Sequence, residues 1–184
     1  MRFLVFYGSY RSERLGIDVA EYMTEQLKKA GHEAKLIDAK EVCPGMLDKM
    51  YKEYDGDAPA WMSKLADRIS EADGFVLVSG EYNHSMQPGL TNLMNYFQEE
   101  YLHKPTGIVA YSPSDFGGAR AAMQVRAFMA ELGSITIPSI LYFPRAHTLK
   151  EKISENSSGL HERTTKFIKE LIWYADALKR KRES

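Results

Sequence analysis

Five short apolar runs, separated by longer stretches of helical periodicity, limit the fold of this 184-residue chain more than any other feature. The expected strands are Phe3–Tyr7, Glu33–Ile37, Phe75–Ser79, Thr106–Tyr111 and Ser139–Tyr142. The first, third and fourth runs are almost continuously apolar, which is typical of strands that are covered on both faces of a sheet.

Between these runs, apolar residues recur every three or four positions, a spacing that predicts amphipathic helices. The stripes are Ile17, Ala20, Met23 and Leu27; Trp61, Leu65, Ile69 and Ala72; Leu90, Leu93, Met94 and Phe97; and Ala122, Val125, Phe128 and Leu132. A final helix is expected from about Gly159 to Lys179, followed by a solvated basic tail that ends at Arg182. This alternation predicts an α/β fold in a single domain of residues 1–184, with a parallel sheet and helices on both faces.

The composition argues against several classes of function. The chain has 24 Lys and Arg against 25 Asp and Glu, so it offers no basic field for nucleic acid. Its apolar stretches fall short of the roughly 18–20 residues that cross a bilayer, and the first run is too short for a signal peptide. Cys43 is the only cysteine, which excludes an internal disulfide. We therefore expect a cytoplasmic protein with neither a nucleic-acid nor a membrane partner.

The connection from Ala39 to Ala60 has little periodicity and carries Met46, Met50 and two glycines. A loop of this length in a compact domain is usually functional or contains a small helix of its own. We expect either a surface excursion with one helical turn or the wall of a site or interface, since Met-rich surfaces adapt to varied partners.

Three further loops stand where ligands of open parallel sheets bind. Such ligands collect at the carboxyl ends of the strands, near the point where the strand order reverses. The loops Gly8–Gly16, Gly80–Gly89 and Ser112–Gly118 each follow an apolar run and are rich in Gly, Ser, Asn or Pro. We expect the functional site to be built from them.

The first of these loops has the composition of a phosphate site. It directly precedes a helix, whose free N–H groups and partial positive charge suit an anion. Ser9 and Ser12 add hydroxyl donors, while Arg11 and Arg14 add charge-assisted hydrogen bonds. Neither a Walker motif nor a G-x-G-x-x-G fingerprint is present. The alternative interpretation is a capped helix with solvated arginines.

The second loop contains Glu81, Tyr82, Asn83 and His84, whose side chains and backbone groups suit the edge of a flat heterocycle. His84 is a candidate general base or, together with Glu81, a candidate metal ligand. No second histidine lies nearby in the sequence, so we expect His84 to line a pocket and expect no metal.

The third loop begins at Ser112 and ends in the pair Gly117 and Gly118. Paired glycines permit positive φ angles and a close approach of the backbone to a ligand. The alternative is a tight strand-to-helix turn in which Asp115 or Ser114 caps the following helix.

Together, the three loops resemble the motifs of the NADPH-dependent FMN reductase family, flavodoxin-like enzymes that include quinone, azo-dye and chromate reductases. The family's GSxRxxS or GSxRxxR loop is matched from Gly8 to Arg14, its PEYNxSxPxxLKN loop by Glu81-Tyr82-Asn83, Ser85, Leu90 and Asn92, and its SxxxxGGxRA segment by Ser112 with Gly117-Gly118-Ala119-Arg120-Ala121. Order and spacing agree over roughly residues 1–140. The chain departs from the pattern at Gly80 and Gln87, where the family usually has proline, and at Thr91, where lysine is common.

The resemblance implies a flavodoxin-like three-layer sandwich, whose five-stranded parallel sheet has the order 2-1-3-4-5. It also implies FMN as the cofactor and NAD(P)H as the co-substrate. The residues that it assigns to the FMN phosphate are Ser9, Arg11 and Arg14. Those assigned to the isoalloxazine ring and ribityl chain are Glu81, Tyr82, Asn83 and His84 on one edge, and Ser112, Gly117 and Gly118 on the other.

The implied function is that of an NAD(P)H oxidoreductase. It would pass two electrons by ping-pong hydride transfer through flavin N5 to a small quinone-, azo- or flavin-type acceptor. Because the flavin carries the chemistry, no catalytic side chain is expected. The resemblance also implies a homodimer or homotetramer.

A flavodoxin-like electron carrier and a non-enzymatic flavin-binding redox module are the alternatives. Carriers are usually strongly acidic, whereas the net charge here is −1. For a redox-sensing module, Cys43 is the only candidate thiol.

Overall fold

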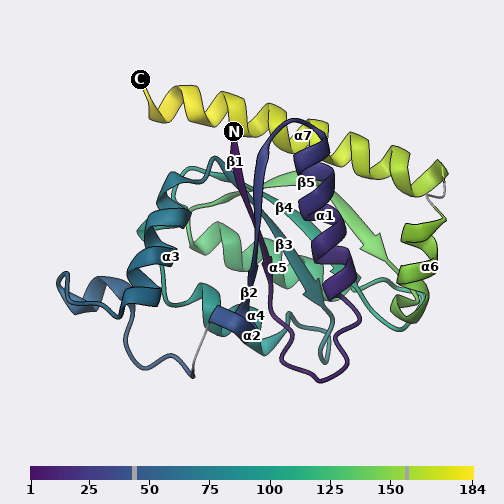
Figure 1. Ribbon diagram of the computed structural model, residues 1–184, viewed down its shortest axis with the longest axis horizontal. Helices are drawn as coiled ribbons and strands as arrows, with labels where there is room; N and C mark the ends of the chain where they lie inside the picture. The colour runs from purple at the N-terminus through teal and green to yellow at the C-terminus, as the bar shows by residue number, and fades with distance from the viewer. Residues whose placement is uncertain (43–44, 156–157) are drawn as a thin grey trace.

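The computed structural model describes residues 1–42, 45–155 and 158–184 and contains one five-stranded sheet (Figure 1). The strands are β1 (Arg2–Tyr7), β2 (Glu33–Asp38), β3 (Gly74–Gly80), β4 (Pro105–Tyr111) and β5 (Ile135–Phe143). All four pairings are parallel, in the order β2-β1-β3-β4-β5. The predicted fold class and strand order are thereby confirmed.

Helices cover both faces of the sheet. In Figure 1, the first and the last of the long helices, which are α1 and α7, lie in front of it. They are α1 (Ile17–Lys29), α2 (Ala39–Val42), α3 (Ala60–Glu71), α4 (Pro88–Met94), α5 (Ala119–Glu131), α6 (Leu149–Ser154) and α7 (Ser158–Arg182), with short 3-10 turns η1 (Tyr51–Tyr54), η2 (Glu99–Tyr101) and η3 (Ala146–Thr148). None of these helices, within the part of the chain that the structure describes, is long and apolar enough to cross a membrane.

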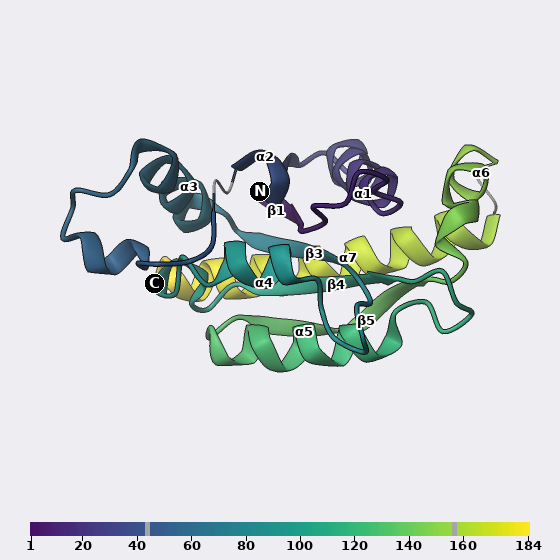
Figure 2. The same cartoon turned by 90° about the horizontal axis from the view of Figure 1, so that it is seen from below.

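The core lies in two layers because successive side chains of a strand point to opposite faces. Phe3, Val5 and Tyr7 of β1 are buried against α1 and α7, whereas Leu4 and Phe6 are buried against the helices of the other face. Every residue of β3 and β4 is buried, which is why these strands read as continuous apolar runs. Figure 2 shows the helical layers, with α5 on the opposite side of the sheet from α1.

The edge strand β5 begins at Ile135, four residues earlier than the pattern predicts. Its first half is hard to recognise in the sequence because Pro138 lies inside it and because Ile135 and Pro138 are exposed. The pairing with β4 shifts register between Thr106 and Ile108, which accommodates the proline at this sheet edge. The Arg126 side chain covers the bulge by donating to the carbonyls of Ile137 and Pro138, both at 3.2 Å.

The length of the connection of residues 39–60 suggested a small helix of its own. The structure has two short helical segments there, the helix α2 and the 3-10 turn η1. The Tyr51 N–H at the start of η1 donates to the Tyr96 carbonyl at 2.8 Å, which attaches the connection to the end of α4. The thiol candidate Cys43 lies outside the described residues.

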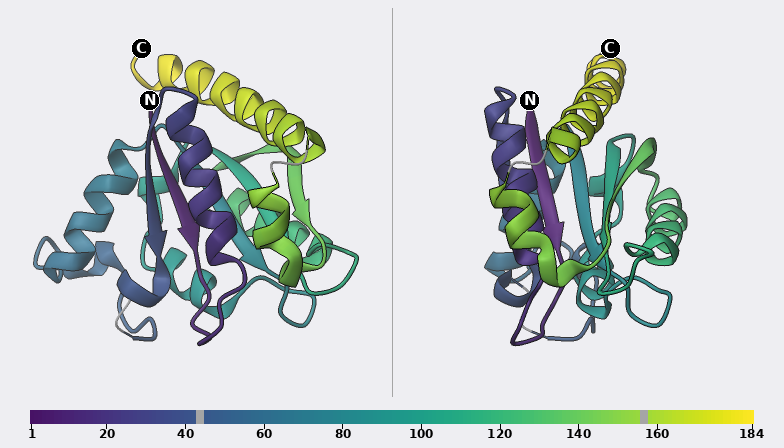
Figure 3. Two further views of the ribbon diagram at one scale, coloured as in Figure 1. Left: turned by 45° about the vertical axis from the view of Figure 1, so that its right-hand side comes forward. Right: turned by 90° about the vertical axis from the view of Figure 1, so that its right-hand side faces the viewer.

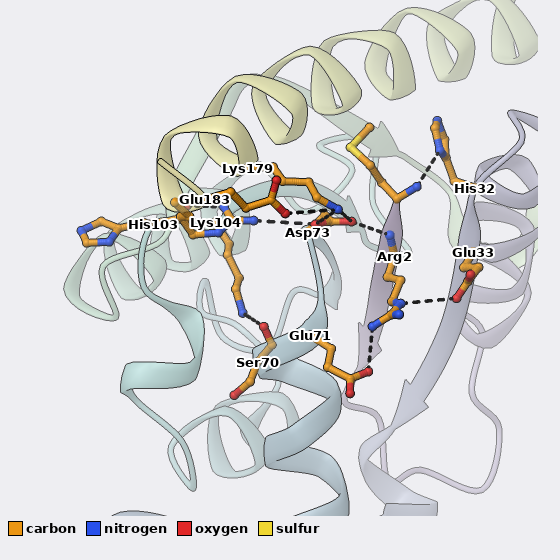
Figure 4. Close-up of polar contacts among 12 residues, drawn as sticks. Arg2, His32, Glu33, Ser70, Glu71, Asp73, His103, Lys104, Lys179 and Glu183 are labelled. Atoms are coloured by element: carbon orange, nitrogen blue, oxygen red, sulfur yellow. Dashed lines mark hydrogen bonds and ion pairs between the residues drawn. The ribbon is translucent and has the colours of Figure 1, made fainter.

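The prediction of a solvated basic tail is wrong. Helix α7 continues to Arg182, and its last turn contacts the carboxylate of Asp73 just before β3 (Figure 4). The Lys179 ammonium lies 3.1 Å and the Arg182 guanidinium 3.8 Å from an Asp73 oxygen, and the Arg2 N–H donates to the other oxygen at 2.8 Å. Because Asp73 is only 5% exposed, its charge needs these partners, and the two cationic side chains among them come from the last turn of α7.

Lys104 stabilises the same end of the sheet in a different way. Its ammonium donates to the carbonyls of Ile69 at 2.6 Å, Ser70 at 2.7 Å and Glu100 at 2.9 Å, so that it caps the carboxyl end of α3. Burial, together with the nearby Arg182 charge, lowers the pKa of Lys104 to about 8, although Asp73 and Glu100 act in the opposite direction.

This pKa predicts a pH-dependent stability. Between pH 8 and the ordinary lysine value of 10.5, the unfolded chain holds a proton that folded Lys104 has lost, so the free energy of unfolding rises with pH for this group. We expect the stability difference between the wild type and Lys104→Met to increase by about 2–3 kcal/mol from pH 7.5 to pH 10, measured by urea unfolding. A difference that stays constant over this range would contradict the assignment.

Candidate functional site

The three loops that the sequence singles out meet at the carboxyl end of the sheet, at the opposite end from both termini (Figure 3). We call residues 8–16 loop 1, residues 80–89 loop 2 and residues 112–118 loop 3. They border one hollow of about 480 Å³, here called the central cavity, which also reaches Ala146 after β5. Its size falls in the range of about 300–1,000 Å³ that is usual for ligand sites.

Loop 1 contributes a hydroxyl and an unpaired cation to the central cavity. The cavity is lined by Ser9, which is 2% exposed, and by Arg11, which is exposed. No carboxylate of the described residues forms an ion pair with Arg11. Helix α1 starts after Gly16 without a side-chain cap; the Ile17 N–H donates to the Arg14 carbonyl at 3.1 Å, and the N–H groups of the next two residues donate to no described backbone carbonyl. This end of the cavity therefore suits an anion.

Arg14 has a different environment from Arg11. Its guanidinium forms a hydrogen-bonded ion pair with Asp38, the last residue of β2, and lies 5.9 Å from the centre of the Tyr7 ring. Burial favours a lower pKa for Arg14, but the hydrogen bond and charge of Asp38 outweigh it and raise the pKa above its usual value. Arg14 thus fixes loop 1 to the end of β2 and does not line the central cavity.

Loop 2 makes a tight two-residue turn. Tyr82 and Ser85 exchange two backbone hydrogen bonds of 2.9 Å, and the φ angles of Asn83 and His84 between them are 49° and 64°. Two successive positive φ angles define a type I′ turn, in which asparagine is favoured. The N–H groups of Asn83 and His84 donate to no other described backbone carbonyl, so they remain available as donors.

Glu81 connects loop 2 to the helix that follows loop 3. Its carboxylate accepts the N–H groups of Arg120 at 3.1 Å and Ala121 at 3.4 Å in the first turn of α5, and lies 3.6 Å from the Arg120 guanidinium. The caps of α5 suggested by the sequence, Asp115 and Ser114, are therefore wrong. A residue 39 positions earlier in the chain supplies the cap because the sheet brings the two loops together.

Loop 3 is shaped by its glycines. Gly117 and Gly118 have φ angles of 62° and 82°, as the glycine pair predicts. Ser112 is buried at the end of β4, where its hydroxyl lies 2.9 Å from that of Ser114. Asp115, on the outside of the loop, lies 3.2 Å from the Arg145 guanidinium.

The structure divides the ten predicted site residues into two groups. Those that line the central cavity are Ser9, Arg11, Glu81, Tyr82, Asn83 and Ser112. Those that do not are Arg14, His84, Gly117 and Gly118. In the second group, Arg14 braces loop 1, His84 lies at the exposed tip of loop 2, and the glycines shape loop 3.

A second hollow of about 600 Å³, here called the side pocket, adjoins the central cavity. The two share Arg11 and Tyr82. The remaining lining residues of the side pocket are Gly8, Tyr10, Gly45, Met46, Pro88, Gly89 and Asn92. A further hollow of about 660 Å³ lies at the other end of the sheet, beside Arg2 and Glu71, away from all three loops.

The Asn92 amide of α4 holds the wall of the side pocket in place. It donates to the Gly45 carbonyl at 2.8 Å and accepts the Leu47 N–H at 2.8 Å, on either side of Met46. The sequence motif identified Asn92 but gave no reason for it, and Asp38 was missed altogether. The sequence does contain a signal that could have identified Asp38 as a site residue. Asp38 stands at the carboxyl end of a predicted strand, beside the phosphate-type loop.

Fold and site together define a class, namely flavodoxin-like α/β proteins that hold a ligand at the carboxyl end of a five-stranded parallel sheet. The family model described as NADPH-dependent FMN reductase matches residues 1–148, and the chain belongs to that family. Its members are oxidoreductases that work with FMN and NADPH, as the resemblance in the three loops implied.

Named relatives agree with this membership. A quinone reductase from Pseudomonas putida is 26% identical over 176 residues, which cover 91% of this chain and 89% of the relative. An NADPH azoreductase from a Bacillus species is 28% identical over 109 residues, 59% of this chain. A quinone reductase from Escherichia coli is 32% identical over 94 residues, 46% of this chain. The last two alignments span only 61% and 50% of those relatives.

Solved structures support the fold. FerB, a flavoenzyme NAD(P)H:(acceptor) oxidoreductase from Paracoccus denitrificans, aligns with a TM-score of 0.73 at 19% identity over 94% of this chain and 98% of its own. A flavodoxin variant from Pseudomonas aeruginosa aligns with a TM-score of 0.58 at 18% identity, over 92% and 99%.

Proposed function

We propose that this protein binds FMN in the central cavity and uses NAD(P)H to reduce a quinone-, azo- or flavin-type acceptor. The observation that carries the proposal is the convergence of three ligand-type loops on one cavity that contains a cation without a carboxylate partner among the described residues. Relatives named as quinone and azo reductases support the class of acceptor.

The end of the cavity that carries Arg11 fits the phosphate of FMN. Ser9 offers a hydroxyl, Arg11 a guanidinium and α1 the N–H groups of its first turn. Arg14, whose charge is shared with Asp38, contributes by holding loop 1 in place and by adding positive potential.

The other end fits the polar edge of an isoalloxazine ring. Asn83, in the turn of loop 2, and Ser112, at the end of β4, both line the cavity, and the Asn83 N–H donates to no described backbone carbonyl. Donors that are fixed before binding stabilise negative charge on a ligand without reorganisation. Glu81 keeps loops 2 and 3 at a constant separation through its contact with α5.

Held by Ser9 and Arg11, FMN would supply the redox chemistry, a ping-pong transfer of hydride and two electrons through its N5 atom. For a quinone the balance is NAD(P)H, one proton and quinone on one side, and NAD(P)⁺ and hydroquinone on the other. No side chain of this protein forms or breaks a covalent bond in that balance. The role of the chain is to position the reactants and exclude water.

The side pocket is the proposed seat of the acceptor. It adjoins the central cavity at Arg11 and Tyr82, and its walls carry the apolar surfaces of Tyr10, Met46 and Pro88, which suit a flat aromatic molecule. Met46 is 83% exposed, and Asn92 holds the backbone on both sides of it.

Replacing Asn92 by leucine is expected to raise the KM for a quinone about tenfold, because two hydrogen bonds that position Met46 are lost. The dissociation constant of FMN should change by less than about twofold, since Asn92 does not line the central cavity. The control is Gln98→Leu, which removes an amide that binds Lys52 of the same connection, away from the side pocket. An equal change of KM in both variants would contradict the assignment of the acceptor seat.

The proposed function is tested by an absorbance spectrum of the purified protein with FMN, followed anaerobically by NADPH and then by a quinone. We expect flavin absorbance that NADPH bleaches and the quinone restores. A protein that takes up no FMN would refute the proposal. A yellow protein that NADPH does not bleach would also refute it and would favour the electron-carrier alternative.

We also propose a homodimer or homotetramer, with the exposed connection around Met46 at or near the subunit contact. Exposed apolar side chains of this kind mark interaction surfaces. Light scattering on the FMN-loaded protein tests this, and a monomer with full activity would refute it.

A further inference from the structure

Two glycines beside the central cavity face the same side chain, that of Tyr111 at the end of β4. A Cβ atom on Gly16, the last residue of loop 1, would lie 2.2 Å from both Cε1 and Cζ of the Tyr111 ring and 2.5 Å from its hydroxyl oxygen. A Cβ atom on Gly80, the first residue of loop 2, would lie 2.8 Å from Cζ of the same ring. These distances are shorter than real Cβ contacts, so neither position has room for a side chain while the ring is there.

The backbone does not require glycine at either position. Gly16 has a φ angle of −89° and a ψ angle of −2°, which most residue types adopt. Gly80 belongs to β3 and has no positive φ angle. Gly118 of loop 3 differs, because its φ angle is 82° and an added Cβ atom would lie 2.8 Å from the Tyr111 backbone. The Tyr111 ring therefore accounts for the glycines at positions 16 and 80.

The Tyr111 ring is held in place from loop 2. The Gln87 side-chain N–H donates to the Tyr111 hydroxyl at 2.8 Å, and the Tyr7 hydroxyl lies 3.3 Å from it. Gln87 is buried, and its side-chain oxygen has no hydrogen-bond partner among the described residues, which is unfavourable. Gln87 is thus placed for the N–H that it donates, and the ring that accepts it cannot turn away from the two glycines.

The ring acts on the amino end of α1. Gly16 directly precedes this helix, and its carbonyl accepts the Ala20 N–H at 3.1 Å in the first turn. Tyr111 itself lines the central cavity. The ring therefore sets the distance between the end of β4 and the first turn of α1, whose free N–H groups the proposed function assigns to the FMN phosphate. Burial raises the pKa of Tyr111, so the phenol is uncharged at physiological pH and does not repel an anion there.

We propose that Tyr111, held by Gln87, is the spacer that positions the amino end of α1 for the phosphate of bound FMN. Tyr111 is then a positioning residue, which acts on the cofactor through Gly16 and the helix behind it. The inference rests on the proposed binding of FMN and deepens it by naming Tyr111 and Gly16, which lie outside the three motifs. It also gives the departures at Gly80 and Gln87 a physical reason, since a Cβ atom at position 80 would meet the ring and Gln87 binds its hydroxyl.

The test adds the same Cβ atom opposite three different side chains at position 111. Gly16→Ala alone should raise the FMN dissociation constant about tenfold, because N–H groups that bind a charged phosphate are displaced. In a Tyr111→Phe background the effect should be as large, since phenylalanine keeps the Cε1 and Cζ atoms that a Cβ atom would meet. In a Tyr111→Leu background, which lacks both atoms, Gly16→Ala should change the constant by less than about twofold. Flavin fluorescence measures all of these constants.

Riboflavin, which lacks the phosphate, separates the positioning of α1 from a general disturbance of the cavity. Its dissociation constant should change by less than about threefold in Gly16→Ala. The matched control is Gly107→Ala within β4, where an added Cβ atom would lie 2.5 Å from Cζ of Phe167, away from the residues that line the central cavity. This control should lower stability against urea but leave the affinity for both flavins unchanged.

An equal effect of Gly16→Ala in all three backgrounds, or an equal loss of affinity for both flavins, would overturn the proposal. If Gly16→Ala does not fold, the comparison is made by urea unfolding. Tyr111→Leu must then restore a cooperative transition that Tyr111→Phe does not restore, and the absence of this rescue would also overturn the proposal. Wild-type protein that fails to bind FMN would instead refute the proposed function, before any variant is compared.

Discussion

Replacing Arg11 by alanine is expected to weaken FMN binding about 100-fold. Arg11 lines the central cavity and has no carboxylate partner among the described residues, so its charge is available to a phosphate. Hydrogen bonds to charged groups contribute about 1.5–3 kcal/mol each, and a factor of 100 corresponds to about 2.7 kcal/mol. Titration of the apoprotein with FMN, followed by flavin fluorescence, measures the change.

Two comparisons make this prediction specific. Riboflavin should bind Arg11→Ala nearly as well as the wild type, because the lost partner is the phosphate. Arg163→Ala removes an exposed arginine of α7 that, among the residues the structure describes, donates only to a carbonyl of its own helix, and FMN affinity should be unchanged there. If Arg11→Ala kept FMN affinity within threefold of the wild type, the phosphate would have to bind elsewhere.

Arg14 illustrates what the sequence could not predict about this site. In the sequence, Arg11 and Arg14 are two equivalent cations in a loop before a helix. The structure separates them because β2 runs beside β1 and brings Asp38 to the end of loop 1. The difference between a ligand-binding arginine and a bracing arginine thus depends on an ion pair between residues 24 positions apart, which the pairing of β1 with β2 brings together.

The elements themselves were predictable where one physical signal dominates. Strands β1, β3 and β4 are buried on both faces and produce continuous apolar runs, and α1 and α3 show clear periodicity with a polar outer face. The signal was lost where contacts at long range decide. Strand β5 is half-exposed and contains a proline, and the basic end of α7 is ordered by Asp73, which is distant in sequence.

For the site, the sequence located the loops and the structure adds what fixes them relative to one another. Glu81 caps α5, Arg14 pairs with Asp38, and Tyr111 touches a glycine from each loop. All three are contacts between chain segments that no local pattern encodes. They share a consequence, since each holds donors in place before a ligand arrives, which reduces the reorganisation that binding requires.

The close approach of Gly8 in loop 1 to the backbone of α4 predicts the largest loss of stability. A Cβ atom on Gly8 would lie 2.2 Å from the Leu90 Cβ atom, 2.3 Å from its backbone nitrogen and 2.4 Å from its Cα. These atoms belong to the first turns of α4 and cannot rotate away as the end of a flexible side chain can. Gly8→Ala must therefore push loop 1 away from α4, and we expect it to lower the free energy of unfolding by about 3 kcal/mol.

The same displacement should abolish FMN binding at micromolar concentrations, because Ser9 and Arg11 move with loop 1. Urea unfolding measures the stability, and the matched control is Gly159→Ala near the start of α7, where an added Cβ atom meets nothing within 4 Å. Alanine is a better helix former than glycine, so this control should be neutral or stabilising by up to about 1 kcal/mol. If Gly8→Ala were as stable as the control, loop 1 would not be packed against α4, and the geometry that brings its phosphate donors to the cavity would be wrong.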